Sequence, residues 1–317
     1  MRVPVALLLI CIAVQGSHAQ LTLRPDVEIP ALPAFRPLPP MDLALTAELR
    51  TIVEAADLNV MTPADQNPDG VDEWSSICLV DLRDLADPRL ASWQARNLVY
   101  PASTYKLYVM GEAIRQVCEG EMTLDDVFVV EEHNVRGGSR LTAGQQVTLS
   151  EVLRLMMQYS DNTAANVAID IVDRQRASAL LRAMGCFGSD ITRKYLSRSL
   201  EDEGYADVPG TESSALHFAT FLWAAETGAI GGGRGRGLIR GYLSMVETGT
   251  ERMRAGLPDS ATLMSKTGTW DTFSSECGII EDGETRYILC VMTALPSDVA
   301  NPRIADLTRR VHALMSE

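Results

Sequence analysis

Apolar positions recur with a helical period near the start and at the end of the chain. Residues 41–58 place apolar side chains three and four positions apart, and residues 304–315 repeat the pattern. Runs typical of strands cover residues 75–82, 274–280 and 286–294. The pattern predicts two terminal helices packed side by side on one sheet.

The order of these elements predicts how the chain is divided. Strand-like sequence lies near the two ends, and the region between is rich in helices and loops. We expect an α/β domain from residues 42–92 and 245–317, with an all-α domain, residues 93–244, inserted into it. Six prolines in residues 20–41 remove backbone hydrogen-bond donors, so this segment is expected to be an extended tether.

A glycine-rich stretch, residues 228–241, reads GAIGGGRGRGLIRG. It lacks the Gly-Lys-Ser/Thr ending of a phosphate-binding loop, and no strand-like sequence precedes it. We therefore expect a flexible loop between helices.

The first nineteen residues have the pattern of a secretory signal peptide. Arg2 precedes an apolar run, Val3–Val14, and small residues lead to Ala19, so a mature secreted or periplasmic chain is expected to begin at Gln20. The run is shorter than the ~20 residues that cross a bilayer, and no similar run follows. We expect no membrane insertion.

Composition narrows the class of partner. The formal net charge is −14 and the pI is near 4.8, so nucleic acid and anionic membranes are repelled. A small molecule or neutral polymer is the expected partner, and a monomer is the expected state. The sequence has no His/Cys spacing typical of a metal site and no Gly-x-Ser-x-Gly motif, so neither a metal nor another cofactor is expected.

Five cysteines follow the signal peptide and form no Cys-x-x-Cys pair. Cys78 and Cys290 both lie in strand-like runs and are a candidate disulfide in an exported protein. Buried free thiols are an equally good interpretation.

The stretch YPASTYKLYVM places Ser103 three residues before Lys106, just after Pro101. Positions three apart share a helix face, so the amine can reach the hydroxyl, and a helix start offers backbone N–H groups to an oxyanion. Lys106 acts as a base only if burial or a neighbouring cation lowers its pKa from about 10.4. The alternative is a helix cap followed by a solvated lysine.

A second polar stretch, YSDNTAAN, follows a helical pattern over residues 149–158. Ser160 and Asn162 alternate in what we expect to be an extended link, so they point to one side. A hydroxyl there can relay a proton to a leaving group, and an amide can hold a substrate carbonyl. The alternative is a polar connection between helices with Ser or Asp as a cap.

A third stretch, SKTGTW, precedes strand-like sequence. Lys266 supplies a cation, Thr267 and Thr269 supply hydroxyls suited to a carboxylate, and Gly268 leaves room for a ligand against the strand. The backbone N–H groups of Thr269 and Ser103 are the expected oxyanion donors. The alternative is an exposed strand entry with a solvated lysine.

The motifs S-T-Y-K, S-D-N and K-T-G, in this order, resemble those of the penicillin-recognising serine enzymes, most closely the class A β-lactamases and their D-alanyl-D-alanine peptidase relatives. The resemblance covers nearly the whole mature chain. It implies an α+β fold of the β-lactamase/transpeptidase type, with a five-stranded antiparallel sheet flanked by helices, an inserted all-α domain, and the active site between the two domains.

The resemblance also implies roles for the residues of the first two motifs. Ser103 is expected to be the acylated nucleophile and Lys106 a base. Ser160 is expected to be a proton shuttle, and Asn162 a substrate contact.

For the substrate carboxylate, the resemblance implies contacts from Lys266, Thr267 and Thr269. Some members of the family place an auxiliary arginine shortly before K-T-G, and Arg252 is the candidate here. Its alternative is an ordinary surface charge.

One element of the family pattern is missing. Class A enzymes carry a glutamate in an E-x-x-L-N string after S-D-N, and this acid activates the water that releases the acyl group. The corresponding loop reads ITRKYLSRSLEDEG, and alignment without gaps puts Arg198 at the position of the acid. Glu201 is the nearest carboxylate, ahead of Asp202 and Glu203, and all three are also explained as solvated loop charges.

The sequence therefore predicts a β-lactam hydrolase that works through a covalent serine acyl-enzyme. One alternative is a penicillin-binding D,D-peptidase or esterase-like acyltransferase with slow deacylation, and another is a non-catalytic binding protein on the same fold. The expected ligand is a small-molecule β-lactam or a D-Ala-D-Ala-like peptide.

Overall fold

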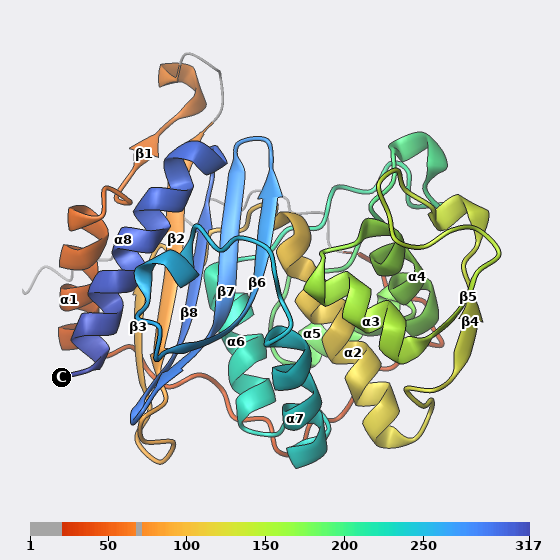
Figure 1. Cartoon of the computed structure of the whole chain (residues 1–317), viewed down its shortest axis with the longest axis horizontal. Helices are drawn as coiled ribbons and strands as arrows, with labels where there is room; N and C mark the ends of the chain where they lie inside the picture. Colours follow the sequence, from red (N-terminus) through yellow and green to blue (C-terminus); the bar gives the residue numbers. More distant parts are fainter. Residues whose placement is uncertain (1–20, 68–71) are drawn as a thin grey trace, which may run out of the picture.

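The computed structural model describes residues 21–67 and 72–317, so the expected signal peptide lies outside the described residues. An antiparallel sheet covered by helices forms one side of the molecule, and a group of helices forms the other (Figure 1). The strands of the sheet are β1 (Met61–Thr62), β2 (Glu73–Asp81), β3 (Arg89–Trp93), β6 (Thr262–Trp270), β7 (Phe273–Asp282) and β8 (Thr285–Thr293).

The strand order is β1-β2-β8-β7-β6, and β3 also pairs with β2. β1 pairs with residues 73–74 of β2, whereas β3 pairs with residues 77–81. The short β1 therefore extends the edge that β3 forms. The predicted five-stranded antiparallel sheet flanked by helices is confirmed, with this two-residue strand as an addition.

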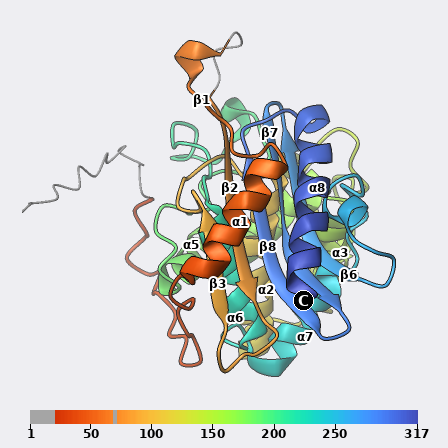
Figure 2. The same cartoon turned by 90° about the vertical axis from the view of Figure 1, so that its left-hand side faces the viewer.

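Two terminal helices, α1 (Leu43–Ala55) and α8 (Ser297–Met315), lie side by side on one face of the sheet, as their periodicity predicted (Figure 2). The side chain of Asp42 caps α1, because it accepts hydrogen bonds from the backbone N–H groups of Ala44 and Leu45 at 2.9 and 3.0 Å. α8 begins at Ser297, earlier than the apolar pattern indicated.

The central strands are apolar on both sides because both faces of the sheet are covered. In β2, Ile77 and Leu79 belong to the core beneath α1 and α8, while Cys78 and Val80 belong to the core on the opposite face. This alternation follows from the two-residue period of a strand. It explains why the strand reads as a continuous apolar run.

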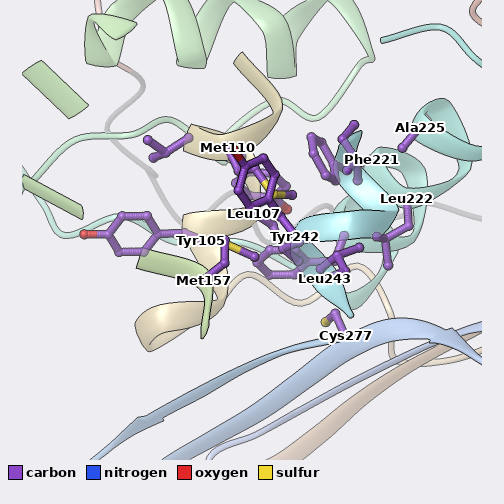
Figure 3. Packing of buried hydrophobic residues seen from close by; sticks show 14 of the residues in the cluster. Tyr105, Leu107, Met110, Met157, Phe221, Leu222, Ala225, Tyr242, Leu243 and Cys277 are labelled. Carbon is purple, nitrogen blue, oxygen red and sulfur yellow. The ribbon is translucent and has the colours of Figure 1, made fainter. Parts of the chain in front are cut away.

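The helical side of the molecule is centred on α2, which packs against several other helices (Figure 3). Leu107 and Met110 of α2 lie among residues of α6 and α7, and Cys277 of β7 lies below them. Among the described residues, no helix has the length and hydropathy of a membrane span. The remaining elements are α2 (Lys106–Glu119), β4 (Val127–Val129), β5 (Gln146–Thr148), α3 (Leu149–Gln158), α4 (Asn162–Val172), α5 (Arg174–Ala183), α6 (Ala215–Glu226) and α7 (Gly232–Leu243).

The glycine-rich stretch is not a flexible loop, so that prediction was wrong: most of it forms α7. A side chain at Gly231 or Gly235 would collide with its neighbours. A Cβ at Gly231 would lie 2.5 Å from the Cys118 sulfur on α2, and one at Gly235 would lie 1.9 Å from the Ile230 carbonyl oxygen. Close packing against Cys118 of α2 and against the turn before α7 therefore requires glycine at these two positions, despite its poor helix propensity.

The proline-rich segment is extended but lies along the protein surface. The Trp223 indole donates to the Arg36 carbonyl at 2.8 Å, and the backbone N–H of Leu21 donates to Asp190 at 3.0 Å. The backbone N–H of Arg24 donates to the Gln175 side chain at 2.6 Å. The segment is thus fixed to the helical side at several points.

The buried cysteines of the sheet form a row and are free. Cys290 is paired in register with Cys78 on one side and with Cys277 on the other, and all three thiols are free. The candidate disulfide between Cys78 and Cys290 is therefore not formed in this structure. Burial raises the pKa of the Cys78 and Cys290 thiols.

Candidate active site

Ser103 lies in a short 3₁₀ helix, Ala102–Tyr105, that runs directly into α2. Ala102, just before it, has a φ of +49°, a conformation that is costly for a residue with a Cβ. The turn that leads into α2 is therefore strained at the residue next to Ser103. Strain of this kind is often found at functional sites.

Lys106 is fully buried and its amine lies 3.3 Å from the Ser103 hydroxyl oxygen. The amine also donates to the Ser160 carbonyl at 2.5 Å, to the Ser160 hydroxyl at 3.2 Å and to Asn162 Oδ1 at 2.8 Å. Burial, followed by the nearby positive charge of Lys266, lowers the pKa of Lys106 well below its ordinary value. The base that the sequence required is thus placed beside the hydroxyl.

The link that carries Ser160 is not extended, in contrast to our prediction. Ser160 has a φ of +57°, and Asp161 caps α4 by accepting from the Ala164 N–H at 3.0 Å. Ser160 and Asn162 nevertheless both reach the Lys106 amine. A left-handed residue followed by a helix start brings them to one side here.

Lys266 comes from β6 and meets the same serine from the other direction. Its amine donates to the Ser160 hydroxyl at 3.0 Å and to the Thr267 carbonyl at 2.8 Å. Burial lowers its pKa to about 7, against an opposing effect of the Glu276 carboxylate. Ser103, Lys106, Ser160 and Lys266 are therefore linked by consecutive contacts of 3.3, 3.2 and 3.0 Å.

The threonines of β6 are held by side chains on neighbouring segments. Thr267 shares a hydrogen bond of 2.6 Å with Thr248, and Arg252 donates to the Thr269 hydroxyl. Thr269 is exposed on an edge strand of the sheet. Its backbone N–H and that of Ser103 stay predicted oxyanion donors.

Arg252 is neither the surface charge nor an open substrate contact. It is 2% exposed, and its guanidinium donates to the carbonyls of Gly268 and Ser275, each at 2.9 Å, and to the Asn301 side chain at 2.6 Å. Burial lowers its pKa. Through these contacts, Arg252 connects β6 to β7 and to α8 and so has a structural role.

Gly268 is required for a reason that differs from our expectation. A Cβ at this position would lie 2.3 Å from the Pro101 carbonyl oxygen and 2.6 Å from the hydroxyl oxygens of Thr104 and Ser275. The close neighbour is therefore the segment that carries Ser103. The glycine lets that segment pack directly on β6.

Glu201 does not reach the site through any contact of its carboxylate. Its side chain is fully buried, accepting from the Arg174 guanidinium at 3.0 Å and from the backbone N–H of Lys194 at 2.9 Å. Asp202 pairs with Arg174 and with Lys194, the latter at 3.1 Å, so these two acids fasten the loop. Arg198 is exposed and donates to the Ala206 carbonyl at 2.7 Å, and Glu203 is exposed.

Tyr195 is a loop residue that lies next to Lys106 and to the turn that carries Ser103. It was not identified from the sequence. The Lys106 amine is 4.3 Å from its ring centroid, and the ring stacks on Tyr105 at 4.8 Å. Its backbone N–H donates to Asn166 Oδ1 at 2.7 Å, and its hydroxyl donates to the Ala102 carbonyl at 3.3 Å. The sequence signal was slight, a single aromatic residue in a polar loop.

A polar cavity of about 380 Å³ opens beside the S-D-N turn. The guanidinium of Arg140 lies 3.7 Å from the ring centroid of Tyr159 at its wall. No group of three or more potential metal ligands occurs in the described part of the chain. The residues around the cavity are Arg136, Gly137, Gly138, Ser139, Arg140, Tyr159, Ser160, Asp161, Asn162, Glu247 and Thr248.

Comparison with known proteins agrees with this fold. The sequence profile of the β-lactamase enzyme family matches residues 75–315. The β-lactamase OXY-2 of Klebsiella oxytoca is 32% identical over 131 residues, 39% of this chain, and the match spans only 42% of that protein. The β-lactamase CTX-M-8 of Citrobacter amalonaticus is 25% identical over 232 residues, 71% of this chain and 78% of its own.

Among solved structures, PBP-A has a TM-score of 0.72 at 20% identity and covers 88% of this chain and 99% of its own. A mutant of PBP-A was solved as an acyl-enzyme complex with penicillin G. The fold and the linked serine and lysine side chains define a penicillin-recognising serine hydrolase. The chain belongs to the β-lactamase enzyme family.

Proposed function

We propose that the protein opens β-lactam rings by forming a covalent acyl-enzyme at Ser103 and then hydrolyses that ester. The observation that carries the proposal is the chain of contacts from Ser103 through Lys106 and Ser160 to Lys266. Family membership supports the same reaction class.

In acylation, neutral Lys106 takes the proton of Ser103 as the hydroxyl oxygen attacks the lactam carbonyl. The Oγ–C bond forms and the lactam C–N bond breaks. Ser160, within hydrogen-bond distance of both lysines, passes a proton to the leaving nitrogen. The N–H groups of Ser103 and Thr269 are the proposed donors to the oxyanion.

The substrate carboxylate is proposed to bind near Lys266, Thr267 and Thr269. These side chains supply an amine and two hydroxyls on one stretch of β6. Asn162 is proposed to hold the substrate amide, because its side chain lines the polar cavity. A monomeric, exported protein fits these substrates, and the pattern of residues 1–19 supports export.

A D,D-peptidase that binds penicillin and releases it slowly is the second candidate. It is favoured by the contacts of Glu201, whose carboxylate is bound by Arg174 and Lys194. Fast release needs a base on a positioned water. Release of D-alanine from a cell-wall peptide, with a long-lived penicillin adduct, would favour this candidate.

The test is intact-mass measurement of the protein with benzylpenicillin, together with turnover of a chromogenic cephalosporin. We expect one adduct on Ser103 and multiple turnovers. Ser103→Ala removes the nucleophile, so turnover should fall at least about a thousandfold and the adduct should disappear. Ser199→Ala is the matched control, because Ser199 is an exposed loop serine. Undiminished turnover by Ser103→Ala would refute the proposal.

A further inference from the structure

Tyr195 is one of the groups that surround the fully buried Lys106 side chain. The Lys106 amine donates to Ser160 and Asn162. The centroid of the Tyr195 ring lies 4.3 Å from the same amine. Stacking on Tyr105, with an angle of 8° between the rings, fixes its plane.

Three further contacts hold Tyr195 and its anchor in place. Its backbone N–H bonds to Asn166, which is fully buried and donates in turn to the Asn134 carbonyl at 3.0 Å. The phenol donates to the Ala102 carbonyl, one residue before the nucleophile. The ring is therefore positioned by α4 and by the Ser103 turn together.

The groups around Lys106 leave little choice of base. In the described part of the chain, no carboxylate lies within ion-pair distance of the Lys106 amine, and the charges that act on its pKa are Lys266 and Asp161. Burial raises the pKa of the Tyr195 phenol well above its ordinary value, so it stays protonated and cannot accept a proton near neutral pH. Lys106 is the remaining proton acceptor beside Ser103.

We propose that Tyr195 is a positioning residue that shields Lys106 and one side of Ser103 from water, so that Lys106 serves as the base in both acylation and deacylation and hydrolysis of the acyl-enzyme limits the rate of each turnover. The inference rests on the proposed acyl-enzyme at Ser103. In deacylation, Lys106 takes a proton from water as the water oxygen bonds to the ester carbon. The ester Oγ–C bond then breaks, and the proton returns to Ser103 Oγ.

The proposed route for this water is the polar cavity, whose lining includes Ser160 and Asn162 but not Tyr195. Removal of the ring opens a second approach. It also lets water reach the amine, which reduces the burial that lowers the pKa of Lys106.

The experiment compares Tyr195→Phe, Tyr195→Leu and Tyr195→Ala with the unaltered protein, using benzylpenicillin as the probe. Mass spectrometry gives adduct lifetime, and stopped-flow kinetics gives the acylation rate against pH. We expect Tyr195→Phe to stay within about threefold in lifetime and Tyr195→Ala to shorten it at least about tenfold, with Tyr195→Leu between them. The pH of half-maximal acylation should move upward in the order Phe, Leu, Ala.

Tyr205→Ala is the matched control, because Tyr205 lies in the same loop, where its hydroxyl accepts a hydrogen bond from Gln175 and its ring lies under the Arg174 guanidinium. It should leave both the lifetime and the pH profile unchanged. An unchanged lifetime and pH profile in Tyr195→Leu and Tyr195→Ala, with normal acylation, would overturn the shielding role. Failure of the unaltered protein to form any adduct would instead defeat the proposed function.

Discussion

At the scale of single residues, the site depends on two buried lysines that share one hydroxyl. Both amines lie within hydrogen-bond distance of Ser160, and neither side chain is exposed. Burial penalises the charged form of each amine, and the charge of Lys266 adds to the effect on Lys106. One lysine can then act as a base while the other binds an anion.

Lys266 gives the first prediction, which concerns pH. Its pKa is lowered to about 7, so it loses the charge that attracts a carboxylate as the pH rises through that value. In the non-acylating Ser103→Ala background, the dissociation constant for benzylpenicillin should increase about tenfold between pH 6 and pH 8.5. Adding Lys266→Arg, which stays charged, should flatten the profile. A pH-independent affinity in the Ser103→Ala protein would contradict the assignment.

The same shift has a consequence for folding. The unfolded lysine keeps its proton up to about pH 10.5, whereas the folded one loses it near 7, so the unfolded state binds more protons between these values. Burial of the charged Lys266 amine therefore lowers the stability of the folded state by its full amount below about pH 7. This loss of stability becomes smaller as the pH rises from 7 toward 10.5.

The three motifs could be recognised from the sequence, because each is a short set of residue types whose chemistry follows from spacing. Tyr195 could not, since its role depends on the position of Asn166 and on stacking with Tyr105. The structural role of Glu201 could not be predicted from the sequence either. An acidic residue in a loop has the same sequence signal whether its carboxylate faces water or binds Arg174. Burial and partner choice are properties of the folded chain.

At the scale of elements, the nucleophile is held by direct contact between the Ser103 turn and the sheet. Thr104 shares a hydrogen bond of 2.7 Å with Ser275, and Ser275 donates to the Pro101 carbonyl at 3.0 Å. Gly268 lies beneath these contacts. The K-T-G stretch, which was expected to precede strand-like sequence, itself lies within a strand, β6, and the turn packs against this strand.

Gly268→Ala tests this arrangement. The added Cβ would meet the Pro101 carbonyl at 2.3 Å, so the turn has to move away from β6. We expect acylation to slow at least about a hundredfold, because the reacting groups lose their alignment. Stability should fall by about 1–3 kcal/mol, measured by denaturant unfolding.

Gly241→Ala is the control for Gly268→Ala. It lies in α7 with no atom within 4 Å of an added Cβ, so it should leave acylation unchanged and add up to about 1 kcal/mol of stability. Normal acylation in Gly268→Ala would show that the contact between the Ser103 turn and β6 does not align the reacting groups.

At the scale of the whole molecule, the extended N-terminal segment, residues 21–40, packs along the helical side and stabilises it. Phe35 and Leu38 pack against the larger core, and Arg36 receives a hydrogen bond from the indole of Trp223. The proline pattern predicted the extended backbone but not these attachments, because proline density limits conformation without choosing a partner.

A chain that begins at Met41 should therefore be folded but less stable. Loss of the partly buried Phe35 and Leu38 side chains and of the hydrogen bonds to Trp223, Asp190 and Gln175 should lower the melting temperature by at least about 4 °C. No residue of this segment contacts Ser103 or Lys106 in the described structure, so the acylation rate should stay within about twofold of normal. An unchanged melting temperature would mean that the segment contributes nothing.

The pairing of β2 with β8 brings together positions far apart in the chain, and the same is true of the two lysines. During synthesis on a ribosome, Ser103 emerges 163 residues before Lys266, and β7 and β8 come later still. A nascent chain therefore carries its nucleophile without the strand that completes the catalytic centre. The proposed reaction with a β-lactam therefore requires that translation has first delivered these strands.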